Sequence, residues 1–145
     1  MEALLISACL LGSNCKYSGG TNALGEETLR ALREKWKLVP VCPEVSGGLP
    51  GPRVPSERRG ASVVSRTGQD VTAAFERGAD TACRLCGRFG CRTALLKENS
   101  PSCGSGTIYD GSFSGTLVPG FGLTAEKLSE SGVVLYGESE TEKLL

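Results

Sequence analysis

The segment from Leu38 to Arg53 constrains the fold and the chemistry of this chain more than any other. It begins with a short apolar run, Leu38 to Val41, which is typical of a buried strand. Cys42 follows directly, so a thiol is expected just beyond the strand end, where sites form in open α/β sheets. Pro43 disfavours a helical conformation at Cys42, and the glycines of CPEVSGGLPGPR allow tight turns. Glu44 is then held two residues from the thiol, as a candidate general acid or base.

The start of the chain repeats this arrangement. Leu4 to Ile6 is a second short apolar run, and Cys9 follows it as Cys42 follows the other. Between the two runs, apolar residues at helical spacing predict a helix from about Asn22, as its N-cap, to Lys37. Strand, helix and strand form a βαβ unit, in which the two strands are parallel. We therefore expect Cys9 and Cys42 at one edge of the sheet.

The middle of the chain supplies a further helix and strand. Asp70 can cap a helix that continues to about Cys86 and ends at Gly87. Cys91 to Leu96 is predicted to be a strand, and it leads into a loop that contains Cys103. This third thiol also lies beyond a strand end.

Other segments complete the expected architecture. Gly51 to Gly68 is predicted to be mostly a functional loop, apart from a strand candidate at residues 62–64. The sequence IYDGSFSG predicts a hairpin-like turn, and the chain closes with a helix from Thr124 to Ser131 and a strand from Val133 to Tyr136. The length fits one domain, residues 1–145, with an α/β fold and a mostly parallel sheet.

The charge balance argues against a nucleic-acid partner. Lys plus Arg and Asp plus Glu both number 16, and like charges form no long run. Since nucleic-acid binders carry basic patches, we expect a small-molecule partner and no nucleic acid. The apolar segment Met1 to Leu11 is too short to span a membrane and lacks the basic start of a signal peptide. No membrane association and a cytoplasmic location, with reduced cysteines, are expected.

Seven cysteines and no histidine point to thiolate chemistry, and two sets of cysteines compete for it. The local set, Cys83, Cys86 and Cys91, has the spacing of a metal knuckle, but it falls on apolar faces of predicted elements, which favours burial as small hydrophobic residues. The second set is distant in sequence and consists of Cys9, Cys42 and Cys103. Its members follow strand ends, whose loops converge at the carboxyl edge of the sheet.

Three soft thiolates without histidine favour an iron–sulfur cluster over a hard cation. A cubane cluster held by three cysteines leaves its fourth iron free for a ligand, which implies chemistry rather than electron storage. The alternative is a closed, inert zinc site in which Cys15 is the fourth ligand.

Three sequence blocks, CLLGSNCKYSGG, CPEVSGGLPGPR and LKENSPSCGSGTIYDG, together resemble the DUF523 family, to which thiouracil desulfidases belong. The resemblance implies a single-domain, three-layer Rossmann-like α/β fold with helices on both faces of the sheet. It also implies a [4Fe-4S] cluster carried by Cys9, Cys42 and Cys103, with Glu44 and Ser100 at catalytic positions. The chain departs from the family at Ser18, where Asp is frequent.

The activity implied by this resemblance is desulfuration of a thiolated nucleobase, such as 2-thiouracil, to the oxo base and hydrosulfide. The sulfur would bind the open iron, Glu44 would relay a proton from the attacking water, and Ser100 would hydrogen-bond the base or the developing anion. Two other functions are compatible with the sequence. One is cluster-mediated sulfur transfer to an acceptor, and the other is a non-catalytic zinc or iron–sulfur binding module.

The two catalytic candidates also have purely structural interpretations. Glu44 could be a loop carboxylate paired with Arg53 or Arg58, and Ser100 could cap the turn that follows it. Arg53 and Glu57 are expected to pair with each other and to brace the loop over the site.

Overall fold

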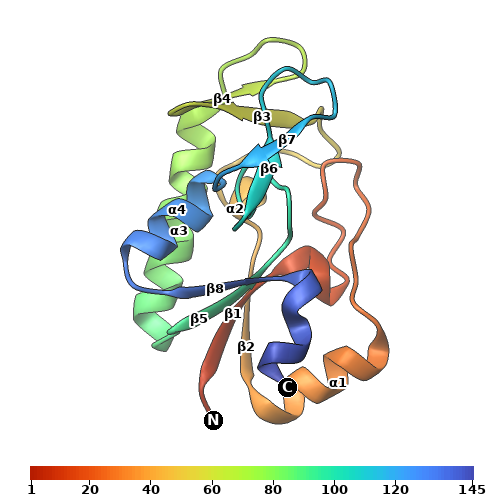
Figure 1. Ribbon diagram of the computed structural model, residues 1–145, viewed down its shortest axis with the longest axis vertical. Helices are drawn as coiled ribbons and strands as arrows, with labels where there is room; N and C mark the ends of the chain where they lie inside the picture. Colours follow the sequence, from red (N-terminus) through yellow and green to blue (C-terminus); the bar gives the residue numbers. More distant parts are fainter.

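The computed structural model describes residues 1–145 and is built on a four-stranded sheet (Figure 1). Its strands are β1 (Ala3–Ser7), β2 (Lys37–Val41), β5 (Thr93–Leu96) and β8 (Val134–Gly137), in the order β2-β1-β5-β8. All three neighbouring pairs are parallel. Every residue of β1 is buried, as expected for a parallel strand that is covered on both faces. The predicted α/β fold with a parallel sheet is confirmed.

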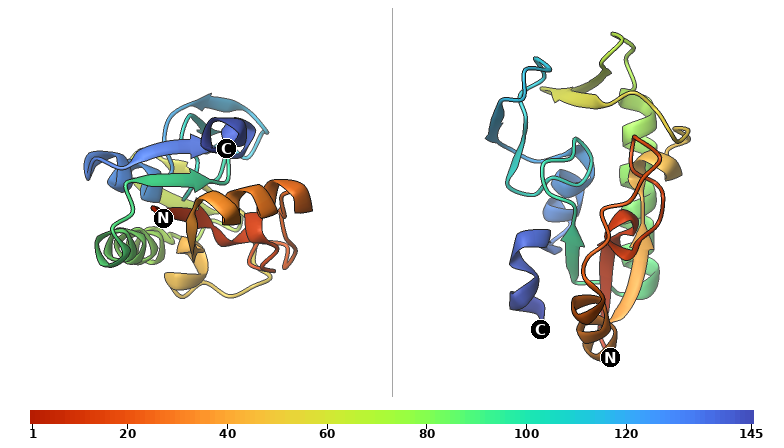
Figure 2. Two further views of the ribbon diagram at one scale, coloured as in Figure 1. Left: turned by 90° about the horizontal axis from the view of Figure 1, so that it is seen from below. Right: turned by 90° about the vertical axis from the view of Figure 1, so that its right-hand side faces the viewer.

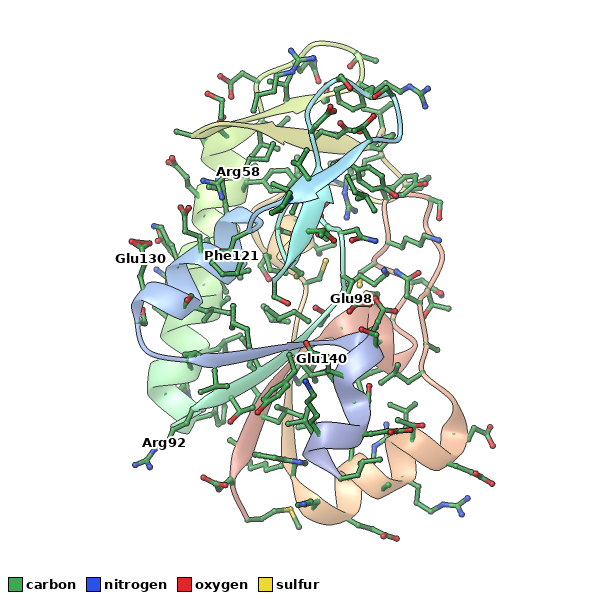
Figure 3. All side chains as sticks on the ribbon, in the orientation of Figure 1. Arg58, Arg92, Glu98, Phe121, Glu130 and Glu140 are labelled. Atoms are coloured by element: carbon green, nitrogen blue, oxygen red, sulfur yellow. The ribbon has the colours of Figure 1, made fainter.

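Helices cover both faces of this sheet, which gives three layers (Figures 1 and 2). One face is covered by α1 (Glu26–Lys35) and by the C-terminal 3-10 helix η2 (Glu138–Leu144), and the other by α3 (Thr72–Phe89) and α4 (Leu123–Glu130). Successive residues of a strand point to opposite faces. Accordingly, Leu4 packs with Leu32 of α1, whereas Leu5 belongs to the cluster that contains Ala82 of α3 and Leu128 of α4.

The strand order reverses beside β1, and this reversal locates the site. The first crossover places β2 on one side of β1, and the second places β5 on the other. A crevice forms at the carboxyl ends of strands where such a reversal occurs. The short helices η1 (Ala8–Leu11) and α2 (Pro43–Ser46) follow β1 and β2 there.

Two antiparallel hairpins lie beyond this carboxyl edge, at the top of Figure 1. They are β3 (Ser56–Arg59) with β4 (Ser62–Ser65), and β6 (Thr107–Tyr109) with β7 (Leu117–Pro119). The second confirms the hairpin predicted from IYDGSFSG. The first corrects the interpretation of residues 51–68 as mostly loop. The Arg- and Ser-rich sequence did not reveal this hairpin, because only a few of its side chains are buried. Glu57 and Val63 are among these few.

The first helix begins later than its sequence suggests. It starts at Glu26 instead of near Asn22, and β2 already contains Lys37. The amides of Asn22 and Leu24 donate to the carbonyls of Cys9 and Leu10, at 3.1 and 2.9 Å. These bonds hold the preceding segment against η1, so it cannot enter the helix.

The end of α3 also differs from the prediction. Gly87 lies inside the helix, which continues to Phe89 and ends at Gly90, whose φ of 67° is left-handed. Cys91 donates its amide to the carbonyl of Cys86 as part of this ending, at 3.0 Å, so β5 starts only at Thr93. The last predicted helix and strand are confirmed to within one residue at each end, whereas η2 was not predicted. None of the helices combines the length and apolar character needed to span a membrane.

Candidate active site

A cavity of about 380 Å³ opens at the carboxyl edge of the sheet. Its floor includes Ser7 and Val41, from the ends of β1 and β2, and Lys97, directly after β5. The two hairpins contribute Ser56 and Tyr109. This volume is within the range of small-molecule sites.

Four of the seven cysteines line the cavity. Cys9 lies in η1, Cys42 follows β2, and Cys103 lies in the loop after β5. The structure thus brings together the three thiols that the sequence places beyond strand ends. Cys15, from the loop after η1, is the fourth.

Hydrogen bonds hold the segments that carry Cys9 and Cys42. The carbonyl of Cys9 accepts from the amide of Asn22 at 3.1 Å and from Oγ1 of Thr21 at 2.9 Å. The thiol of Cys42 donates to the carbonyl of Cys15, at 3.7 Å. The loop after η1 is therefore tied to the ends of both strands.

The loop that carries Cys103 is held by the N-terminus of α4. Amides of Leu123 to Ala125 donate to the carbonyls of Pro101 and Ser102, at 2.9 to 3.1 Å. These are amides that have no partner within a helix. The approach is so close that a Cβ on Gly122 would lie 2.5 Å from the carbonyl of Ser102. The helix therefore fixes the backbone next to the thiol.

Burial raises the pKa of three cavity thiols, those of Cys9, Cys15 and Cys103. It raises the pKa of Cys103 to about 12. Burial also raises the pKa of Cys9. For Cys15, burial and the neighbouring thiol of Cys42 together raise the pKa to about 12. These three thiols hold their protons near neutral pH in the absence of metal, so a metal that binds them must displace protons.

Glu44 lies in the first turn of α2 and reaches the cavity wall. Its Oε1 accepts hydrogen bonds from Nε and Nη2 of Arg53, at 3.1 and 3.0 Å, and its Oε2 accepts one from Oγ of Ser102 at 3.0 Å. The side chains of Arg53 and Glu44 are only 8% and 16% exposed. The pairing of Glu44 with Arg53 is thus present, and Glu44 still lines the cavity.

The expected pair of Arg53 with Glu57 does not form. Arg53 instead joins Glu44 to the carbonyl of Cys15, at 2.9 Å from Nη2. Glu57 accepts hydrogen bonds from the amides of Gly111 and Phe113, at 2.9 and 3.1 Å, and so joins the two hairpins. The prediction identified the bracing role of Glu57 but not its partner, because the second hairpin is distant in sequence.

Ser100 caps the turn that leads to Cys103. Its Oγ accepts from the amides of Ser102 and Cys103, both at 3.1 Å, which is the structural role considered above. It also lies 2.9 Å from Oγ of Ser102. Sequence reasoning missed Ser102, although the sequence SPSC places a second hydroxyl group directly before the thiol.

The three cysteines of the local set do not line the cavity. Cys86 and Cys91 are buried in the core cluster between the sheet and α3, and Cys83 packs against it. Burial raises the pKa of Cys86 to about 12. The interpretation of these residues as small hydrophobic core residues agrees with this environment.

Comparisons with known proteins identify the family of the chain. The chain is 38% identical over 152 residues to the uncharacterized protein YbbK of Bacillus subtilis (strain 168), with 98% of this chain and 99% of YbbK covered. The solved structure of the [4Fe-4S]-dependent thiouracil desulfidase TudS (DUF523Vcz) is 46% identical and superposes with a TM-score of 0.95, over 99% of this chain and 95% of TudS. The 2-thiouracil desulfurase family matches residues 4–140. With its fold and nearly its whole length matched, the chain belongs to the 2-thiouracil desulfurase family.

Proposed function

We propose that this protein removes sulfur from 2-thiouracil or a similar thiolated nucleobase, with a [4Fe-4S] cluster held by Cys9, Cys42 and Cys103. The observation that carries the proposal is the convergence of these three thiols, from the ends of three parallel strands, on one cavity that also contains Glu44. Membership of the family supports it, as does the similarity to a thiouracil desulfidase that depends on such a cluster.

The side chains of the cavity fit this cofactor. Thiolates are the usual ligands of iron–sulfur clusters, and the chain contains no histidine. No three cysteine, aspartate or glutamate side chains gather closely enough to hold a single metal ion, which weighs against the closed zinc site. A cubane differs from that site because each cysteine binds a different iron atom. Bound at these three thiols, the cluster would supply a Lewis-acidic iron without a protein ligand, to which the sulfur of the substrate can bind.

The reaction is a hydrolysis. The bond from the ring carbon to sulfur breaks, a bond from that carbon to the oxygen of water forms, and no electrons are gained or lost. Water must give up protons as it attacks, and Glu44 is the group proposed to accept one. Arg53 holds Oε1 of this carboxylate and leaves Oε2 for the proton.

Ser100 is the second proposed catalytic residue. It lines the cavity, and its hydroxyl group reaches Glu44 through Ser102. The two proposed catalytic residues therefore belong to one hydrogen-bonded group.

The rim of the cavity suits a planar base. Tyr17 and Tyr109 line it and remain partly exposed, so their rings are available to a heterocycle. Nζ of Lys97 lies 2.7 Å from Oε1 of Glu138, so the charge of this lysine is paired. We further propose that residues 1–145 act as one domain in the cytoplasm, where thiols stay reduced.

The test is an anaerobic preparation assayed with 2-thiouracil and no sulfur acceptor. We expect about four irons per chain after reconstitution, as the cluster contains, and stoichiometric release of hydrosulfide and uracil. Replacement of Cys9, Cys42 or Cys103 by Ala should abolish both. Cys83→Ala, which lies outside the cavity, is the matched control and should retain both.

Three results would reject parts of the proposal. Sulfide that appears only when an acceptor is added would indicate sulfur transfer. Full iron content in Cys103→Ala would show that the ligand set is wrong. Loss of iron in Cys15→Ala would make Cys15 a ligand, as in the four-cysteine alternative.

A further inference from the structure

We propose that Ser102 is a positioning residue that aims the carboxylate of Glu44 at the attacking water. The inference rests on the function proposed above and adds a residue to it. Ser102 lines the cavity wall but is only 2% exposed. Its Oγ lies 3.0 Å from Oε2 of Glu44 and 2.9 Å from Oγ of Ser100. A buried hydroxyl group thus connects the two proposed catalytic residues.

The direction of these hydrogen bonds follows from counting donors and acceptors. A serine hydroxyl has one proton and two acceptor lone pairs. Both lone pairs of Ser100 are used by the amides of Ser102 and Cys103. The proton between the two hydroxyl groups therefore belongs to Ser100, and Ser102 accepts it.

The proton of Ser102 is then free for the carboxylate. It could also point to the sulfur of Cys103, but that contact is 3.7 Å, against 3.0 Å to Oε2 of Glu44. A hydrogen bond to a charged group is the stronger of the two. Ser100 therefore donates to Ser102, and Ser102 donates to Glu44. The proton of Ser100 becomes available to the substrate only when its hydrogen bond to Ser102 breaks.

The carboxylate of Glu44 keeps one free acceptor position for a water molecule. Each carboxylate oxygen has two lone pairs. Arg53 uses both lone pairs of Oε1, through Nε and Nη2, and Ser102 uses one of Oε2. One acceptor position on Oε2 remains. Because Ser102 fixes the orientation of Oε2, it also fixes where a water molecule must lie to give up its proton.

The backbone of Ser102 is anchored independently of its side chain. Its carbonyl accepts hydrogen bonds from the amides of Thr124 and Ala125 in α4, at 3.0 and 3.1 Å. Removal of the hydroxyl group should therefore leave the loop and the thiol of Cys103 in place. This makes Ser102→Ala a test of orientation and not of folding.

The experiment compares Ser102→Ala with the parent in the cluster-loaded protein. We expect unchanged iron content, KM within about threefold, and kcat lower by about tenfold to a hundredfold, the scale of a misdirected catalytic group. In a background of Glu44→Gln, which lacks the base, Ser102→Ala should cause no further loss. Ser105→Ala is the matched control, since this serine lies in the same loop outside the cavity and makes no side-chain hydrogen bond; it should leave kcat unchanged.

A second measurement does not require activity. Urea unfolding of the metal-free parent, Ser102→Ala, Glu44→Ala and the double variant should give non-additive midpoints, because either change removes the same hydrogen bond. A parent that releases no sulfide would refute the proposed function, and this cycle would still test the link. The positioning role is overturned by additive midpoints, by parental kcat in Ser102→Ala, or by losses that multiply in the Glu44→Gln background.

Discussion

At the scale of single residues, Glu44 shows that a structural contact and a chemical role can use different atoms of one side chain. The ion pair with Arg53 uses Oε1, whereas Oε2 accepts a hydrogen bond from Ser102, and the residue lines the cavity. A base must be held in a fixed direction to take a proton efficiently. The ion pair therefore supports the proposed role of Glu44 and does not compete with it.

Replacement of Glu44 by Gln separates a catalyst from a cluster carrier. The amide keeps the size of the side chain and a hydrogen-bonding group but cannot accept the proton. We expect Glu44→Gln to retain full iron content and to bind thiouracil, yet to lose about a hundredfold or more in turnover. The measurement is anaerobic turnover at matched iron content.

The matched control is Glu126→Gln. Glu126 accepts hydrogen bonds from Nη2 of Arg58, at 3.1 and 3.2 Å, so it forms a second Glu–Arg pair that does not line the cavity. It should keep parental turnover. Turnover of Glu44→Gln within about threefold of the parent would remove Glu44 from the mechanism. Loss of the cluster in this variant would instead make Glu44 structural.

The thiols could be predicted from sequence, whereas Ser102 could not. Cys9 and Cys42 each follow a short apolar strand, and this pattern is local. The role of Ser102 depends on Glu44, which is 58 positions away and reaches it only when two loops pack together. No local pattern encodes such a contact.

At the scale of elements, the strands were predictable because their apolar runs are short and continuous, as parallel strands require. The errors lie where distant contacts decide. The hairpin of β3 and β4 is held through Glu57 to backbone amides of the second hairpin. The start of α1 is delayed by hydrogen bonds to η1. Both depend on partners that periodicity cannot show.

Two glycines within α3 provide a test of how this helix positions α2, and with it Glu44. A Cβ on Gly78 would lie 1.8 Å from the carbonyl oxygen of Pro43, which is backbone and cannot move alone. A Cβ on Gly87 would meet nothing within 4 Å. The same substitution therefore has opposite consequences at two sites in one helix.

We expect Gly87→Ala to raise the free energy of unfolding by about 0.5–1 kcal/mol, because Gly costs this much in a helix interior. Gly78→Ala should lower it by about 1–3 kcal/mol, the usual cost of overpacking, and should reduce turnover, since α2 must move away. Urea unfolding of the metal-free proteins and a turnover assay measure both effects. Equal stabilisation by the two variants would show that α2 does not rest on Gly78.

At the scale of the whole molecule, the site is assembled from segments that are far apart in sequence. Cys9, Cys42 and Cys103 lie in three segments that approach each other only at the carboxyl edge of the folded sheet. Equal numbers of acidic and basic residues give the chain no net charge to attract a polyanion. A small neutral substrate and a cofactor that joins the three segments are consistent with both features.

Such a cofactor should stabilise the entire fold, because a group that binds only the folded chain shifts the unfolding equilibrium. A ligand at a free concentration of about a hundred times its dissociation constant adds about 2.7 kcal/mol to the free energy of unfolding. In a chain of this length, 1 kcal/mol shifts Tm by about 2–4 °C, so reconstitution should raise Tm by about 5–10 °C. Anaerobic calorimetry of the same preparation before and after cluster loading measures this change. Cys83→Ala should show the same rise, and Cys103→Ala should show none. A rise in Cys103→Ala equal to that of the parent would mean that the cluster does not join the loop after β5 to the rest of the site.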